Sequence, residues 1–352
     1  MTYFKESSGS DPKQSERLTA LTASIQAPQI KTEQPTFAML SHRAVLHSKI
    51  LGALLFYSIL LVFFIIAAPG FLTFSNAKVV LGGTSIMLIV SLGQALTIIS
   101  GGFDLSVGGV VPLGAVAYGE FLQYRLPIGV AMGLTVLVGA AVGACNGTVV
   151  RLGINPLIAT LATMSMAGGM AYVWSSGSTV AISLGAGFLG NNGPFELPYY
   201  VYVAVILDVS IQLILRRTVL GRRIYVVGGN SEAARLSGIN VGLVRQSVYI
   251  LSGGLAAVAG IMYASQLLGG TGSIGSTVAL TSVAAVVLGG AALTGGTGGV
   301  PGTVLGVLIL GTVVNGFAIM RVSPFFEEII SGLVLLVAVS IAKAQSYMSS
   351  RR

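Results

Sequence analysis

The polar side chains that interrupt the apolar stretches of this chain are mostly neutral hydrogen-bonding groups. Amides and hydroxyls can bind an uncharged polar solute, and inside a membrane they also hydrogen-bond neighbouring helices, for about 0.6 kcal/mol each on average. The second role is the commoner one for any single residue, and the sequence leaves both open. The neutral candidates for a solute pathway are Gln94, Asn146, Thr160, Thr163, Ser165, Gln266 and Asn315.

Two carboxylates could do different chemistry. Asp208 lies within an apolar stretch, where an ionisable side chain is costly and is a functional candidate by default. It could couple the movement of a proton or ion, or it could face the helix bundle and be satisfied there by a neighbouring helix. Asp104, between Gly101-Gly102 and Ser106, is predicted to cap the helix that follows, and a place at a gate or at the ATPase contact is its alternative role.

Other chemistries are excluded by what the sequence lacks. It contains no G-x-x-x-x-G-K-[ST] motif, so the chain does not cradle ATP phosphates itself. No His, Cys or carboxylate cluster has the spacing of a metal site. Cys145 is the only cysteine, so no intrachain disulfide can form. The chain is therefore predicted to be no enzyme and to bind no metal or cofactor.

The elements that carry these residues are predicted from composition and length. Of 352 residues, 54% are hydrophobic and 9% are charged, whereas a soluble domain has about 25% charged residues. The composition predicts an all-α polytopic membrane protein with a disordered polar cytoplasmic tail over residues 1–49, a transmembrane domain over 50–345 and a cytoplasmic C-terminal tail over 346–352. The ten predicted spans are 50–68, 78–100, 106–124, 127–150, 156–174, 197–215, 246–268, 276–298, 301–320 and 325–345.

The basic residues predict the orientation, because Lys and Arg are enriched in cytoplasmic connections. Ten spans put both termini on one side of the membrane, and that side then holds all but three of the 19 Lys and Arg residues. The three exceptions are Lys78, Arg125 and Arg321. Both termini are therefore predicted to be cytoplasmic. The net charge of +8 follows from this asymmetry, so no nucleic-acid partner is predicted.

An internal repeat is also visible. Asn146 and Asn315 are 169 positions apart, and Pro156 and Pro324 are 168 apart. Two five-span halves at such an offset must be inverted relative to each other, because five is odd, as in many transporters. Coincidence among common residues is the alternative. Small-residue pairs that predict close helix packing, or alternatively a dimer seam, are Gly129/Gly133, Gly139/Gly143 and Gly302/Gly306.

The connection over residues 216–245 is the longest polar stretch between predicted spans, and it carries six arginines. A short helix of about seven residues is predicted inside it. Asn230 suits the N-cap, Glu232 lies in the first turn where the helix dipole favours an anion, and Gly238 suits the C-terminal cap. Glu232 and Arg235 are three residues apart and can pair. The helix either docks on another protein or belongs to an ordinary cytoplasmic loop.

Five segments together resemble one family of membrane proteins. GRRIYVVGGNSEAARLSGIN (221–240) looks like the ATPase-contacting loop of permease subunits of ribose-type ABC sugar importers. The family's other signatures are resembled, in the same order, by SGGFDLSVGG (100–109), NPLIATLATM (155–164), VLGGAALTGGTGGVPGTVLG (287–306) and VSPFFEEIISGLVLLVAV (322–339). One departure is Ala279-Leu280-Thr281, where the family often has acidic residues.

The resemblance implies a multi-pass subunit of the bacterial inner membrane that imports a monosaccharide. A separate ABC ATPase, a periplasmic or lipid-anchored sugar-binding protein, and a second copy or a homologous permease would be its partners. For such a pathway or its gate, the candidates by side-chain type and position are Asp104, Gln94, Asn146, Thr160, Thr163 and Asn315. The implied ATPase-coupling residues are Gly229, Asn230, Glu232, Ala233, Ala234, Arg235 and Gly238.

Two other functions remain open. A secondary transporter that couples proton or ion movement through Asp208 would account for the inverted repeat but not for the capped helix. A structural or receptor membrane protein would pass no solute at all.

Overall fold

The computed structural model describes residues 35–275 and 277–323, with 326, 329, 332 and 333, and side chains from residue 51 on. The chain forms two units, Met1–Val45 and Leu46–Arg352, and all packing reported below lies within the second. The longer helices are α2 (Pro35–Ala67), α3 (Phe74–Ile99), α4 (Val107–Gln123), α5 (Ile128–Arg151), α6 (Pro156–Trp174), α7 (Tyr199–Arg217), α10 (Val241–Leu267) and α12 (Val300–Ile319). The shorter elements are β1 (Val180–Ala181), η1 (Phe188–Gly190), η2 (Pro194–Glu196), α8 (Val219–Gly229), α9 (Ser231–Leu236), β2 (Gly269–Gly270) and α11 (Val278–Leu288).

The helical membrane architecture predicted from the sequence is confirmed at a coarse level. Six helices of the described part are long and apolar enough to cross a membrane, and the apolar segment Leu51–Ala67 is a little shorter. The predicted span 156–174 coincides with α6, and the spans 78–100, 127–150 and 301–320 match α3, α5 and α12 to within a few residues. The predicted span 325–345 lies almost wholly outside the described residues.

Two predicted boundaries are corrected. The span 276–298 is wrong, because α11 ends at Leu288 and a glycine-rich loop follows, in which Gly290 and Gly295 have φ of +92° and +89°. Glycine adopts such angles freely and is unfavourable inside a helix. At the N-terminus, α2 begins at Pro35 and covers residues predicted to be a disordered tail, since proline suits the first helical position. Residues 1–34 of that tail lie outside the described part.

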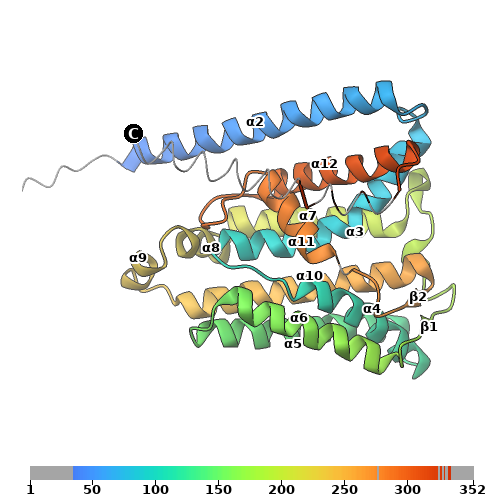
Figure 1. Ribbon diagram of the computed structural model, residues 1–352. Coiled ribbons are helices and arrows are strands. Elements are labelled where there is room, and N and C mark those ends of the chain that lie inside the picture. The colour runs from blue at the N-terminus through green and yellow to red at the C-terminus, as the bar shows by residue number, and fades with distance from the viewer. Residues whose placement is uncertain (1–34, 276, 324–325, 327–328, 330–331, 334–352) are drawn as a thin grey trace, which may run out of the picture. The chain divides into compact units, whose positions relative to one another are not determined.

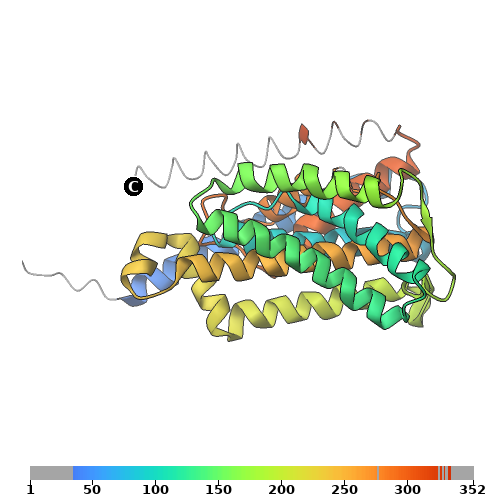
Figure 2. The ribbon, with the colours of Figure 1, turned by 90° about the horizontal axis from the view of Figure 1, so that it is seen from below.

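The helices of the second unit run between two ends (Figure 1). α8 and α9 lie at one end, the α9 end, and the short pair β1–β2 lies at the other, the β end; Figure 2 shows the same separation. Arg151 at the end of α5 reaches Gln246 of α10, with 3.4 Å between Nη1 and Oε1, at the α9 end. Lys78 near the start of α3 pairs with Glu196 of η2, at the β end. The arginine-rich connection and Lys78 therefore lie at opposite ends, as the ten-span topology requires.

Glycines allow α10 to pack closely at the centre of the bundle. α10 lies against α3, α4 and α5. A Cβ on Gly139 of α5 would lie 2.3 Å from the Gly253 carbonyl oxygen, so the two backbones are in contact. The predicted close packing is confirmed for Gly139/Gly143 but is wrong for Gly129/Gly133, which have nothing within 4 Å among the described residues.

Two helices, α4 and α11, start together in the interior. A Cβ on Gly108, the second residue of α4, would lie 3.2 Å from Cβ of Ala279, the second residue of α11. From there α4 runs to the β end, where Gly119 contacts Val180 of β1, and α11 runs to the α9 end (Figure 1). Each of them is preceded by a non-helical segment, residues 100–106 for α4 and the described residues 271–275 and 277 for α11.

Candidate functional site

The connection 216–245 contains the predicted helix with its predicted caps. The Asn230 side chain accepts a hydrogen bond from the Ala233 N–H at 2.9 Å, and Gly238, with φ of +78°, terminates α9. The six residues of α9 are close to the seven expected. α8 was not predicted, although Thr218 is a readable N-cap that accepts from the Gly221 N–H at 3.1 Å.

One side of α9 is anchored and the other is open. Ala234 is completely buried, whereas Leu236 is 80% exposed. Glu232 and Arg235 pair as predicted, with 2.6 Å between Oε1 and Nη2, and both side chains are mostly exposed. Exposed pairs of this kind contribute about 0–1 kcal/mol, so this pair does not hold the helix in place. α9 therefore exposes the charges of Glu232 and Arg235 and the apolar side chain of Leu236. The buried Ala234 anchors the opposite side of the helix.

A junction of glycines joins α8 to the rest of the bundle; it comprises Ile99, Gly101, Gly228, Gly295 and Gly296. The Gly296 N–H donates to the Ile99 carbonyl at 2.9 Å. A Cβ on Gly228 would lie 1.8 Å from that carbonyl oxygen and 2.7 Å from the Gly296 nitrogen. The end of α3, the end of α8 and the loop after α11 are thus in direct backbone contact. The Gly-Gly pairs were the only signal in the sequence, and their spacing says nothing about which of them meet.

Four of the six predicted pathway or gate residues lie in one buried polar network. The Asn146 amide donates to the Ser106 hydroxyl at 2.8 Å and accepts from the Thr163 hydroxyl at 2.6 Å. The Thr160 hydroxyl accepts from the Leu105 N–H at 3.1 Å. Asp104 joins through Ser106, whose N–H and hydroxyl both donate to its Oδ1. The network fastens segment 100–106 to α5 and α6.

The predicted capping role of Asp104 needs a correction. Ser106, not Asp104, occupies the N-cap of α4, and its side chain makes no capping bond. Asp104 instead bonds the backbone two residues on, as a carboxylate does in a tight turn. Its Oδ2 is buried with no partner in the described part of the chain. The sequence also missed Tyr249, whose hydroxyl donates to the Phe103 carbonyl at 3.0 Å and holds the same segment from α10.

The remaining candidates lie elsewhere. Gln94 is buried in α3, and neither atom of its amide has a partner among the described residues. Asn315 donates to the Asn76 side chain at 2.9 Å, away from the network. Ser165 and Gln266 are exposed on α6 and α10. Asp208 is half-buried, and its Oδ1 finds no hydrogen-bond donor in the part that the structure describes, so no bond to a neighbouring helix accounts for this atom.

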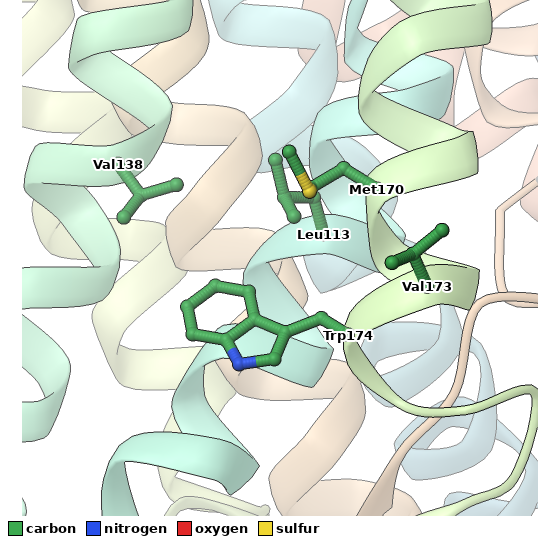
Figure 3. A pocket seen from close by; sticks show the side chains of 5 residues that line it. All are labelled: Leu113, Val138, Met170, Val173 and Trp174. Atoms are coloured by element: carbon green, nitrogen blue, oxygen red, sulfur yellow. The ribbon is translucent and has the colours of Figure 1, made fainter.

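One cavity of the described part is apolar. It has a volume of about 660 Å³ and lies between α4, α5 and α6. Figure 3 shows Met170 and Leu113 close to each other, with the Trp174 indole below them and Val138 on the opposite wall. These side chains offer a sugar almost no hydrogen bonds, so the cavity is not a sugar site by itself. Among the described residues, no group of three His, Cys, Asp or Glu could hold a metal ion.

The chain is similar to known transport proteins over most of its length. A family model described as "Branched-chain amino acid transport system / permease component" matches residues 76–339. The ribose import permease protein RbsC of Escherichia coli (strain K12) is 35% identical over 280 residues, covering 78% of this chain and 87% of that one. The L-arabinose transport system permease protein AraH of the same strain is 38% identical over 292 residues, covering 82% and 88%. RbsC of Bacillus subtilis (strain 168) is 34% identical over 300 residues, covering 84% and 93%. The chain therefore belongs to this family of transport-system permease components, which confirms the resemblance to ribose-type ABC permeases that the sequence motifs carry.

Proposed function

We propose that this chain is the transmembrane subunit of an ATP-driven importer and that its substrate is a monosaccharide. The relatives named above are ribose and L-arabinose permeases at 34–38% identity, and they favour a sugar over the amino acids of the family description. The polar network around Asn146 also contains mainly neutral groups, which suit a sugar better than an ion. No ATP site is present in the sequence, so hydrolysis belongs to a separate ATPase.

The observation that carries the coupling mechanism is the contact of Gly228 with Ile99 and Gly296. An ATPase that moves α9 would move α8 with it, because only one residue separates the two helices. The backbone of α8 is in direct contact with the backbones of α3 and of the loop after α11. These two elements would therefore move together with α8 as rigid parts. From Ile99 the movement would reach segment 100–106, and through Asn146 and Thr163 it would reach α5 and α6.

The finer topology belongs to the same proposal: ten spans in two inverted halves, with the α9 end and both termini in the cytoplasm. The inversion is supported by α4 and α11, whose second residues, Gly108 and Ala279, lie together and which run to opposite ends. Those two residues are 171 positions apart, close to the offsets of 168 and 169 in the sequence repeat. Half-helices that meet in the interior are typical of inverted-repeat transporters.

Two further partners belong to the same proposal. A sugar-binding protein would deliver its ligand to the β end, because the opposite end carries the ATPase-coupling helix. A second copy or a homologous permease would complete the pathway, because the large cavity of this chain is lined by apolar side chains. The remaining exposed apolar side chains of the spans would face membrane lipid.

Uptake in cells tests the function. Cells with the chain, its ATPase and its sugar-binding protein should accumulate labelled ribose or L-arabinose. Accumulation should survive a proton uncoupler, stop on ATP depletion and persist in Asp208→Asn, because an ATP-driven importer needs no carboxylate that carries a proton. Uptake that the uncoupler or Asp208→Asn abolishes would favour a secondary transporter, and uptake of branched-chain amino acids alone would overturn the substrate class.

Reporter fusions test the orientation. A reporter fused after Ser176, in the loop at the β end, should report the periplasm, and one fused after Gly229, at the α9 end, should report the cytoplasm. The reason is the segregation of Lys and Arg between the two ends. Activity of the same reporter at both positions would contradict the ten-span topology.

A further inference from the structure

A second, smaller cavity lies where α7 ends, beside α8 and the start of α12. Its volume is about 100 Å³, and it is lined by Gln212, Arg216, Tyr225 and the glycine-rich segment that leads into α12. It is separate from the polar network and from the apolar cavity, and the coupling mechanism makes no use of it. A cavity of this size accommodates one small headgroup moiety.

The charge at this cavity is fixed in place and is not neutralised. With the Gln212 amide in the orientation that satisfies both side chains, its oxygen accepts from Nε and Nη2 of Arg216 at 2.8 and 3.1 Å. Gln212 is neutral, and no carboxylate of the described residues forms an ion pair with Arg216. The Tyr225 hydroxyl donates to the Gly298 carbonyl at 3.0 Å and so holds the loop that forms the opposite wall. An oriented guanidinium with free N–H groups is a strong partner for a phosphate oxygen.

The residues that precede Arg216 indicate which anion is held. Ile206, Val209 and Leu213 are 63%, 51% and 54% exposed, and with Arg216 they fall on one face of α7 at spacings of three and four. Exposed apolar side chains on a membrane-spanning helix face acyl chains. Arg216 therefore follows a row of side chains that face lipid acyl chains, and it lies where the lipid headgroups begin.

We propose that this cavity binds the phosphate of an anionic phospholipid of the cytoplasmic leaflet, with an acyl chain along Ile206, Val209 and Leu213. The choice of leaflet rests on the proposed orientation, whereas the binding itself does not. Basic residues at the cytoplasmic end of a span attract anionic lipid, and Arg216 adds a fixed hydrogen-bond geometry to that attraction. A bound lipid would link α7, α8 and α12.

The test uses the purified full-length chain in detergent, without ATPase or sugar, so its outcome is independent of the transport function. Binding of phosphatidylglycerol, phosphatidylcholine and inorganic phosphate is measured by titration. The wild type should prefer phosphatidylglycerol over both. Arg216→Gln should weaken that binding by about ten-fold or more, because charge and hydrogen bonds are lost together. Arg222→Gln, which removes an exposed arginine outside the cavity lining, should weaken it by only about two-fold.

Two further variants separate the alternatives. Leu213→Asn should weaken binding of the lipid but not of inorganic phosphate, and Arg216→Lys should retain part of the binding if Arg216→Gln fails to fold. Equal losses in Arg216→Gln and Arg222→Gln would mean diffuse charge attraction, and phosphate binding as tight as lipid binding would mean a soluble anion. Lipid binding unchanged in Arg216→Gln would show that this arginine does not hold the lipid phosphate. Each of these three results overturns the lipid site.

Discussion

Gly228→Ala is expected to abolish ATP-driven uptake, whereas Gly229→Ala should leave it nearly intact. The added methyl group at residue 228 would lie 1.8 Å from the Ile99 carbonyl oxygen, so α8 must separate from α3. Backbone cannot yield there as the end of a flexible side chain can, and overpacking of this kind costs about 1–3 kcal/mol or more. At residue 229 a methyl group meets nothing within 4 Å among the described residues, so Gly229, although it is among the predicted coupling residues, should tolerate alanine.

The two variants are closely matched. They exchange the same residue types at adjacent positions of α8, so their effects on helix propensity are similar, at about 0.5–1 kcal/mol in favour of alanine. Uptake and sugar-stimulated ATP hydrolysis are compared at equal membrane levels of the permease. Hydrolysis that continues without uptake in Gly228→Ala would locate the defect in transmission. Equal transport by both variants would show that the glycine junction does not carry the movement.

Local features of the site could be predicted from the sequence because each depends on a few neighbouring residues. The caps of α9 require Asn230 and Gly238 at a fixed spacing, and the Glu232–Arg235 pair requires one helical turn. The spans of α5 and α6 follow from apolar length alone. These predictions needed no knowledge of which helices are neighbours.

The glycine junction and the polar network could not be derived in this way. Ile99, Gly228 and Gly296 are more than 65 positions apart in the sequence, and only the packing of three elements brings them together. Asn146 was a candidate by type, but its bonds to Ser106 and Thr163 depend on how α5, α6 and segment 100–106 meet. Asn315, with the same amide and a repeat-related position, pairs with Asn76 instead.

The failed span 276–298 has a simpler cause. Its average hydropathy is high, because glycine and alanine count as nearly apolar, but glycine does not stabilise a helix. α11 therefore stops at Leu288, and the loop beyond it contributes Gly295 and Gly296 to the junction. The glycine content of the residues after Leu288 indicates a loop, whereas the average hydropathy of residues 276–298 suggests a continuous span.

Glu232→Arg is expected to abolish association with the ATPase, and uptake with it, while the chain still inserts normally. Within the permease the change is small: the pair with Arg235 is exposed, and a cation in the first turn of a helix costs about 0.3–1 kcal/mol. At a protein interface, a like-charge contact can cost several kcal/mol. Co-purification of the ATPase at matched membrane levels measures the difference.

A charge exchange separates the effect of losing the ion pair within α9 from the effect of changing the charges that face the ATPase. The double variant Glu232→Arg with Arg235→Glu can restore the ion pair within α9 but presents both charges to a partner in reversed positions. If the ATPase contacts those charges directly, the double variant should also fail to bind it. Rescue of binding would show that ATPase association depends only on the ion pair within α9. Because Ala234 anchors the buried side of α9 in either case, the helix should remain in place in both variants. Normal association and uptake by Glu232→Arg alone would contradict the docking role of α9, and the contact with the ATPase would then have to lie on another surface at that end of the bundle.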